Sequence, residues 1–324
     1  MPTAAGDIDQ SDYNAVTPAI SEPVVKRAHA AGDKVIICLG GENSGPRIST
    51  AIAPTLRQEF VSSLTQFVKT RGYDGIDIDM EPIADKDIPN YVSFIHDLRR
   101  SLDSVDKNLL LTAAAPTAPG PVPAMFARLQ KQFDQINVMT YDLSGPWPGF
   151  KSWYNSSLYG NGSQFLFDNI PYPSATNVLQ RYIDAGVATP KLGLGIAFYG
   201  YAWKGVAAPA QPIQGATMNY IDYGSIMDQY YSKAVYHWDN TAHAPYLGIP
   251  NNDPSKSLFI SYDDERLCRE KVLYAKSHQL GGVIIFDLGA GFRPNQPSGQ
   301  QDTLLKAVKK AWKETGPPVA KNRH

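Results

Sequence analysis

The chain has 324 residues, of which 43% are hydrophobic and 19% are charged, so it can bury a sizeable core and is not a disordered chain. Its net charge of -1 gives no basic surface of the kind that nucleic-acid-binding proteins need. No apolar run reaches the roughly 18–20 residues that a membrane span requires.

Short apolar runs alternate with helical patterns along most of the chain. Six runs are predicted to be buried strands, at 34–41, 75–81, 109–115, 135–141, 191–199 and 281–288. Helical spacing of apolar residues predicts helices at 54–72, 90–103, 122–132, 176–186, 264–279 and 302–314. Because apolar strands alternating with helices are typical of a parallel sheet covered on both faces, the pattern predicts an α/β fold.

A closed TIM-type (β/α)8 barrel needs eight strands, two more than these six. Residues 1–33 predict one helix, capped by Ser21 and ended by Gly32, and they contain no clear apolar strand. The first two strands of such a barrel are therefore either hidden in residues 1–33 or lacking.

Two segments are too long to be ordinary loops. Residues 142–175 are rich in aromatic residues, and residues 203–260 are long enough for a small α+β insertion before the last strand. We therefore expect a barrel made of 1–202 and 261–315, the insertion at 203–260, and a tail at 316–324.

The chain has two cysteines, Cys38 in an apolar run and Cys268 on a helical pattern. Both are interpreted as small buried apolar residues and not as a disulfide. Residues 1–6 lack the basic and apolar regions of a signal peptide. A secreted protein expressed without its leader would look the same, so the first residues do not decide whether the protein is secreted or cytoplasmic.

The run 74–81, DGIDIDME, carries the most informative pattern. Side chains alternate between the two faces of a strand, so Asp77, Asp79 and Glu81 share one face, with neighbours roughly 6–7 Å apart. Like charges in a poorly solvated interior favour retention of a proton, and a retained proton is what general-acid catalysis requires. Glu81 is nearest the carboxyl-terminal mouth of the strand, so it is the natural proton donor, tuned by the other two.

Two other interpretations of this run fit its residues less well. A solvent-facing edge strand would also alternate acids, but the residues between these acids are typical of a core. Carboxylates could hold Mg²⁺ or Ca²⁺, but no nearby histidine-rich or Asn/Asp-rich loop completes a coordination shell. We therefore expect no metal.

The run 74–81 resembles the DGxDxDxE signature of family 18 glycoside hydrolases, the chitinases and their relatives. Residues 139–142, MTYD, resemble the MxYD motif of the same family, in the expected order. Residues 34–41 resemble the family's third strand with Cys38 in place of serine, and residues 281–286 resemble its eighth strand with Phe286 in place of tryptophan. The likeness covers about 34–312 and implies a TIM-type (β/α)8 barrel, lacking or hiding its first two strands.

The resemblance implies a chitinase that cuts β-1,4 bonds between N-acetylglucosamine units by a retaining, substrate-assisted mechanism without a cofactor. Glu81 would be the acid and base, Asp79 would hold the acetamido N–H, Asp77 would pair with Asp79, and Tyr141 would donate to the acetamido oxygen. The residues implied in substrate binding are Asp142, Met139, Trp147, Tyr199, Tyr262 and Phe286.

Other functions stay open at this stage. An endo-β-N-acetylglucosaminidase acting on N-glycans would share the carboxylate motif, although the aromatic segments 142–175 and 203–260 suit a long groove for a linear polymer. An incomplete barrel could instead make a weakly active or non-catalytic chitin-binding protein. The expected partner is chitin or a chito-oligosaccharide, with no nucleic acid and no membrane. Open barrel edges could pair two copies into a homo-oligomer, and we expect secretion, with a cytoplasmic location still open.

Overall fold

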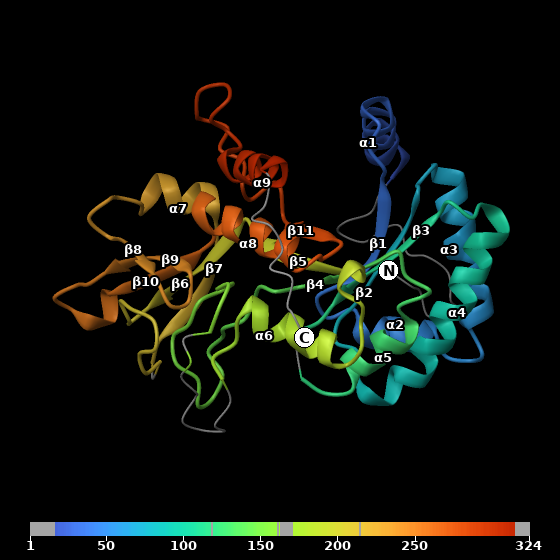
Figure 1. Ribbon diagram of the computed structural model, residues 1–324, viewed down its shortest axis with the longest axis horizontal. Coiled ribbons are helices and arrows are strands. Elements are labelled where there is room, and N and C mark those ends of the chain that lie inside the picture. The colour runs from blue at the N-terminus through green and yellow to red at the C-terminus, as the bar shows by residue number, and fades with distance from the viewer. Residues whose placement is uncertain (1–16, 118, 161, 163–170, 214, 315–324) are drawn as a thin grey trace, which may run out of the picture. The chain divides into compact units, whose positions relative to one another are not determined.

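The computed structural model describes residues 17–117, 119–160, 162, 171–213 and 215–314 (Figure 1). Its contacts divide the chain into two compact units, Met1–Asn137 with Asp184–Lys191, and Val138–Ile183 with Leu192–His324. Within the described ranges, no helix is long and apolar enough to cross a membrane.

The first unit alternates strands and helices along the chain. Its strands lie in the order β1-β2-β3-β4, and β2 pairs in parallel with both β1 and β3. The strands are β1 (Ile36–Gly41), β2 (Gly75–Met80), β3 (Leu110–Ala115) and β4 (Gln135–Val138). The helices are α1 (Pro18–Ala31), α2 (Gly45–Ala51), α3 (Arg57–Arg71), η1 (Asp85–Asp87), α4 (Ile88–Val105), α5 (Val122–Leu129) and η2 (Thr189–Lys191).

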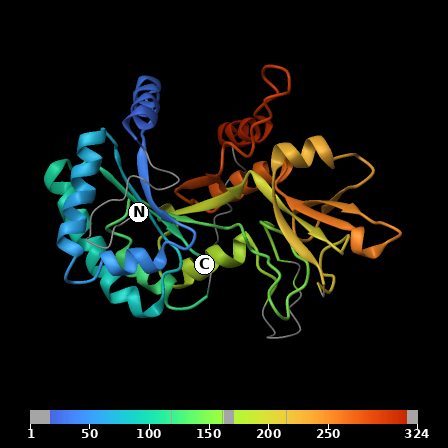
Figure 2. The same ribbon diagram turned by 180° about the vertical axis from the view of Figure 1, so that it is seen from behind.

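The core of the first unit lies between these strands and the helices α3, α4 and α5, which run along one side of them (Figures 1 and 2). On β2, Ile76, Ile78 and Met80 are buried, as strand alternation predicts. Helices α3 and α4 meet through Phe60 and Phe94, whose stacked rings lie 5.7 Å apart. Each such side chain stabilises the fold by about 1.5–3 kcal/mol when it is removed from water.

The start of the first helix differs from the prediction. Helix α1 begins at Pro18 after Thr17, so Ser21 is not its cap. Ser21 is instead buried inside the helix, where its hydroxyl donates to the Thr17 carbonyl. The end of the helix is as expected, because Gly32 adopts the left-handed conformation with φ 81° that suits a residue without a β-carbon.

The second unit contains a parallel strand pair and an antiparallel sheet. Strands β5 and β11 pair in parallel, and the five-stranded sheet has the order β7-β6-β10-β9-β8. The strands are β5 (Leu192–Ala197), β6 (Tyr199–Lys204), β7 (Thr217–Asp222), β8 (Tyr236–Asp239), β9 (Ala244–Ile249), β10 (Leu258–Tyr262) and β11 (Gly282–Phe286). The helices are α6 (Ala175–Asp184), which ends at the boundary with the first unit, α7 (Tyr223–Gln229), η3 (Pro254–Lys256), α8 (Glu265–Ser277) and α9 (Thr303–Lys313).

An aromatic cluster forms the core beside the antiparallel sheet. Trp153, Tyr154, Trp203 and Phe259 are all buried in it, and the Trp153 and Tyr154 rings lie 4.8 Å apart. Much of the aromatic character of segments 142–175 and 203–260 is therefore spent on packing. Trp147 and Tyr220 of the same segments are exposed, so the expectation of a long groove for a polymer stays a prediction.

The described residues contain six strands of the expected parallel type, which are β1 to β4 in the first unit and β5 with β11 in the second. Residues 17–33 hold α1 and no strand. Residues 1–16 lie outside the described part of the chain. The expectation of strands hidden in residues 1–33 is therefore ruled out for residues 17–33 and stays untested for residues 1–16. The domain boundaries predicted from the sequence stay a prediction.

Gly40 offers a test of the β1–β2 packing. A β-carbon at Gly40 would lie 1.8 Å from the Asp79 carbonyl oxygen, whereas one at Gly41 would meet no atom within 4 Å. Both residues have positive φ, 127° and 111°, so backbone strain is common to both. Gly40→Ala should lower the free energy of unfolding by about 2–4 kcal/mol, and Gly41→Ala by about 1 kcal/mol. Urea denaturation checks this, and equal losses for the two variants would contradict it.

Candidate active site

The predicted row of carboxylates lies on and just after β2 in the first unit. Asp77 and Asp79 share one face of the strand, and Glu81 follows Met80, the last strand residue. The register of the sheet places Cys38 of β1 and Thr112 of β3 opposite Asp77. The peptide bond from Glu81 to Pro82 is cis.

Hydrogen bonds from both neighbouring strands satisfy the Asp77 carboxyl. Thr112 Oγ1 donates to Asp77 Oδ1, and Cys38 Sγ lies 3.6 Å from Asp77 Oδ2. The same sulfur lies 4.0 Å from Asp79 Oδ2. Asp79 also shares a side-chain hydrogen bond with Glu81. The three acids and the thiol therefore form one connected polar row.

This row holds protons that isolated carboxyl groups would release. Burial raises the pKa of Asp77, although its hydrogen bonds from Thr112 and Cys38 act in the opposite direction. Burial, then the charges of Glu81 and Asp77 and the hydrogen bond with Glu81, raises the pKa of Asp79 to about 8. The expectation that crowded carboxyl groups retain a proton thus has a physical basis in this geometry.

Cys38 is a free thiol, as expected, but it is exposed and not buried, whereas Cys268 is both free and buried. The prediction for Cys38 was wrong because its place in an apolar run hid which face it occupies. Its side chain lies on the carboxylate face of the sheet and not on the helix-covered face. Desolvation, then the charges of Asp77 and Asp79, raises the pKa of Cys38, so the sulfur keeps its proton and acts as a donor.

Ser44 fixes the backbone that leads to Glu81, and sequence reasoning missed it. Its hydroxyl donates to the Asp79 carbonyl and accepts from the Glu81 N–H, both at 3.0 Å. The Gly45 N–H donates to the Glu81 carbonyl at 2.7 Å. Thr112 was also missed, although it is the one hydroxyl-bearing residue in the apolar run 109–115 and this could have marked it.

A second group of predicted residues meets in the second unit. The ring of Phe286 stacks on that of Tyr141 at 5.9 Å, and Tyr199 packs edge-on against both rings at 6.0–6.1 Å. Phe286 remains 50% exposed, while Tyr141 and Tyr199 are buried. Met139 packs against this cluster as a partly buried residue. One flat apolar ring face is thus presented to solvent on a buried support.

Asp142 is held beside this cluster by two tyrosine hydroxyls. Tyr199 donates to Asp142 Oδ1 at 2.6 Å, and Tyr201 donates to the same oxygen at 2.9 Å. Burial, followed by the charge of Asp142, raises the pKa of Tyr199, so the hydroxyl stays protonated as a donor. Sequence reasoning missed Tyr201, although strand alternation places it on the same face of β6 as Tyr199.

The remaining two candidates lie in different surroundings. Trp147 is 47% exposed, and its ring packs edge-on against Phe150 at 5.0 Å, beside a surface hollow of about 540 Å³. Tyr262 is only 2% exposed and packs against Tyr223. Tyr262 thus lies in the core of the second unit, and its assignment to substrate binding stays a prediction.

Polar groups adjoin the aromatic cluster of the second unit. A hollow of about 340 Å³ is lined by Asp222, Asp287 and Arg293, among others, and by Ala290, which packs in the cluster with Tyr141. Carboxylates and a guanidinium next to an exposed ring are suited to a ligand with hydroxyl groups and a flat apolar face. In the part of the chain that the structure describes, no group of three or more His, Cys, Asp or Glu residues could hold a metal ion.

Comparison with known proteins connects these features to one family. A model of the glycosyl hydrolases family 18 matches residues 5–291. Chitinase A1 of Niallia circulans is 31% identical over 88% of this chain and 44% of its own length. Chitinase 1 of Aphanocladium album is 31% identical over 79% of this chain and 62% of its own length. The chain therefore spans about half the length of these curated relatives.

Solved structures agree on the fold. The immunomodulatory active chitinase of Trichuris suis superposes with a TM-score of 0.81 at 24% identity, over 96% of this chain and 89% of that chain. The Group IV chitinase of Ostrinia furnacalis in complex with allosamidin gives 0.80 at 22% identity, over 98% and 89%. The expected fold class, a TIM-type barrel with some strands missing, is thus confirmed. By the extent of the family match and the identity to its curated relatives, the chain belongs to the glycosyl hydrolases family 18.

Proposed function

We propose that this chain is a chitinase, which hydrolyses the β-1,4 bonds between N-acetylglucosamine units with retention at the anomeric carbon. The observation that carries this proposal is the row Asp77, Asp79 and Glu81, in which the last two share a hydrogen bond and the pKa of Asp79 is raised to about 8. A proton is therefore held in the row near neutral pH, where a general acid needs it.

In the first step Glu81 donates its proton to the glycosidic oxygen, and that oxygen leaves the anomeric carbon with the bonding electron pair. The carbonyl oxygen of the substrate's own 2-acetamido group bonds to the anomeric carbon, which forms an oxazolinium ion, the substrate-assisted route of this family. Asp79 accepts a hydrogen bond from the acetamido N–H through an oxygen that carries no proton, and this bond orients the acetamido group for its attack. Asp77 would supply the second pairing that lets Asp79 switch between partners.

In the second step a water molecule attacks the anomeric carbon from the face that the leaving group vacated. The Glu81 carboxylate takes a proton from this water, while the bond from the acetamido oxygen breaks and restores the amide. Two displacements at one carbon retain its configuration, and Glu81 ends in its starting protonated form. The Ser44 contacts to the backbone at Asp79 and Glu81 support this role, because a general acid must be held within hydrogen-bond reach of its partner.

The residues of the second unit are proposed to bind the sugar. Tyr141 would donate its hydroxyl to the acetamido oxygen, and Asp142 would accept hydrogen bonds from sugar hydroxyls. Phe286 would stack on a sugar ring through its exposed face, as Trp147 would elsewhere, because an aromatic face and the axial C–H groups of a pyranose are both apolar. The exposure of Phe286 and Trp147 supports these roles.

The substrate, partners and location of the whole protein follow from this proposal and stay predictions. The substrate would be chitin or a chito-oligosaccharide, and the protein would be secreted. A homo-oligomer would form through open strand edges. In the first unit β1 is the outermost strand of the described sheet order and pairs on one side with β2, so its other side supports this prediction.

Glu81→Gln tests the mechanism directly. It removes the transferable proton while keeping the size of the side chain, so kcat on chitohexaose should fall by about 10²–10⁴-fold. Glu59→Gln, at an exposed position on α3, is the matched control and should keep the wild-type rate. Product lengths and anomers are read by mass spectrometry and NMR. Equal rates for wild type and Glu81→Gln would refute the mechanism, and cleavage of an N-glycan in place of chitohexaose would favour the endo-β-N-acetylglucosaminidase.

Phe286 is tested by a series of three side chains. Calorimetric titration of chitohexaose into Glu81→Gln protein should show affinity that rises from Leu to Phe to Trp at position 286. The larger ring covers more of the sugar face, and aromatic stacking contributes about 0.5–1.5 kcal/mol beyond area burial, which corresponds to several-fold in affinity. Equal affinities across the series would rule out Phe286 as a sugar platform.

The raised pKa of Asp79 predicts how stability depends on pH. In the folded protein Asp79 keeps its proton up to about pH 8, whereas the unfolded chain releases it near the ordinary value of 3.8. The folded state binds more protons between these values, so this group lowers the free energy of unfolding as pH rises from 4 to 8. Asp79→Asn should therefore gain stability relative to wild type with increasing pH, measured by urea denaturation at pH 5, 6.5 and 8. A constant difference between the two proteins at all three pH values would argue against the shift.

A further inference from the structure

An ion pair is buried in the second unit and takes no part in the proposed chemistry. Lys271 of α8 is 0% exposed and Asp263, just after β10, is 1% exposed, with 2.6 Å between Nζ and Oδ2. Burial raises the pKa of Asp263 to about 6, although the charge of Lys271 acts against this shift. Two charges removed this far from water are costly and are weak evidence for a purely stabilising role. The other contacts of the pair therefore indicate what it does.

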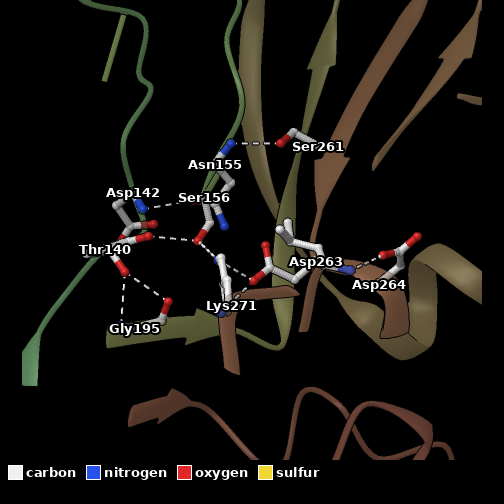
Figure 3. A network of polar contacts seen from close by, with 11 residues as sticks. Thr140, Asp142, Asn155, Ser156, Gly195, Ser261, Asp263, Asp264 and Lys271 are labelled. Atoms are coloured by element: carbon white, nitrogen blue, oxygen red, sulfur yellow. Dashed lines mark hydrogen bonds and ion pairs between the residues drawn. The ribbon is translucent and has the colours of Figure 1, made fainter. Parts of the chain in front are cut away.

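A directional chain of hydrogen bonds leads from the ion pair to the MxYD segment (Figure 3). Lys271 Nζ donates to Ser156 Oγ, and the Ser156 hydroxyl donates to the Thr140 carbonyl at 2.7 Å. A serine hydroxyl has one proton, so that proton stays directed at Thr140 when the other partner of Ser156 is a group that cannot accept it. Lysine is a suitable group, because its ammonium only donates.

The Thr140 carbonyl controls the direction of the residues that follow it. This carbonyl and the Tyr141 N–H belong to one peptide plane, so a hydrogen bond that fixes the carbonyl also fixes how the chain enters Tyr141. The Thr140 side chain adds two bonds of 2.9 Å with the backbone of Gly195 on β5. Thr140 is thus held from two sides, by the sheet and by Ser156.

Asn155, the neighbour of Ser156, fixes the backbone of the same segment at Asp142. Its Oδ1 accepts the Asp142 N–H at 2.9 Å, and its own N–H donates to Ser261 Oγ at 2.7 Å (Figure 3). Asp142 has φ 55°, a left-handed conformation that a non-glycine residue adopts at a cost and that its surroundings must maintain. Residues 155–156 therefore act as a brace for residues 140–142.

We propose that Ser156 and Lys271 are positioning residues, which hold Tyr141 and Asp142 in the orientation that the reaction uses, with Asp263 balancing the lysine charge. This inference rests on the proposed function of Tyr141 and Asp142. The Lys271 ammonium keeps the Ser156 proton directed at Thr140 and supplies no group to the substrate. A displacement of about 1 Å at a reacting group can cost about 100-fold in rate, so a brace of this kind affects kcat.

Ser156→Ala and Ser152→Ala form a matched pair of variants. Ser152 and Ser156 are 0% and 2% exposed, lie four residues apart, and each donates to a backbone carbonyl, that of Ala208 at 2.8 Å and that of Thr140 at 2.7 Å. Each alanine should lower the melting temperature by a few degrees, because each removes a hydrogen bond that the serine hydroxyl donates and one that it accepts, from Lys271 at Ser156 and from the Gln211 N–H at Ser152. Ser156→Ala alone should lower kcat on chitohexaose about 10-fold or more with KM changed less than about 3-fold.

Two further variants separate positioning from stability. Lys271→Met leaves Asp263 as an unpaired buried charge and can fail to fold for that reason. The double variant Lys271→Met with Asp263→Asn removes both charges. It should fold while it keeps the loss of kcat seen in Ser156→Ala, because Ser156 still lacks its donor. A folded double variant with wild-type kcat would overturn the assignment of Lys271.

Hydrogen exchange gives a readout that does not need activity. Peptides containing residues 139–143 should exchange faster in Ser156→Ala than in wild type, and Ser152→Ala should leave their exchange unchanged. If wild-type protein does not cleave chitohexaose, the proposed function fails, and unchanged exchange in Ser156→Ala would then separately refute the brace. If the wild type is active, equal kcat for Ser156→Ala and Ser152→Ala overturns the inference.

Discussion

The crowding of carboxyl groups on one strand face is the constraint on which the rest of the candidate site depends. Asp77, Asp79 and Glu81 repel one another when all are ionised, and burial weakens the solvent screening that would relieve this repulsion. Thr112 and Cys38, on the two neighbouring strands, stabilise the Asp77 carboxyl as hydrogen-bond donors. On the same strand as Cys38, Gly40 has no room for a side chain next to the Asp79 carbonyl.

The candidate binding residues of the second unit are an exposed aromatic ring and a carboxylate, and both need support from buried residues. Trp153 and Trp203 fill the core beside the antiparallel sheet. The sheet then serves as a rigid base from which Tyr199 and Tyr201 reach Asp142. Binding groups supported by regular elements keep their geometry better than groups on unsupported loops. The exposed ring of Phe286 is likewise supported by stacking on the buried ring of Tyr141.

Local sequence patterns predicted the strands and helices well where apolar periodicity was strong. The alternation in residues 74–81 placed Asp77 and Asp79 on one face correctly, because that property depends only on strand geometry. Helix α2 was missed, since it has seven residues, too few for periodicity to show. The partnership of Ser44 with Glu81 joins residues 37 positions apart, and nothing local in the sequence specifies such a contact. The sequence did not reveal that Trp153 of segment 142–175 is buried, because composition does not distinguish a buried aromatic residue from an exposed one.

The sulfur of Cys38 has a consequence beyond its hydrogen bonds. Thiols react with oxidants and alkylating agents through the thiolate form, and an exposed cysteine is normally vulnerable to both. Here desolvation, together with the charges of Asp77 and Asp79, suppresses that form, because both raise the pKa of Cys38. Cys38 is therefore kept in the less reactive thiol form, and the carboxylate row contributes to keeping its own hydrogen-bond donor protonated.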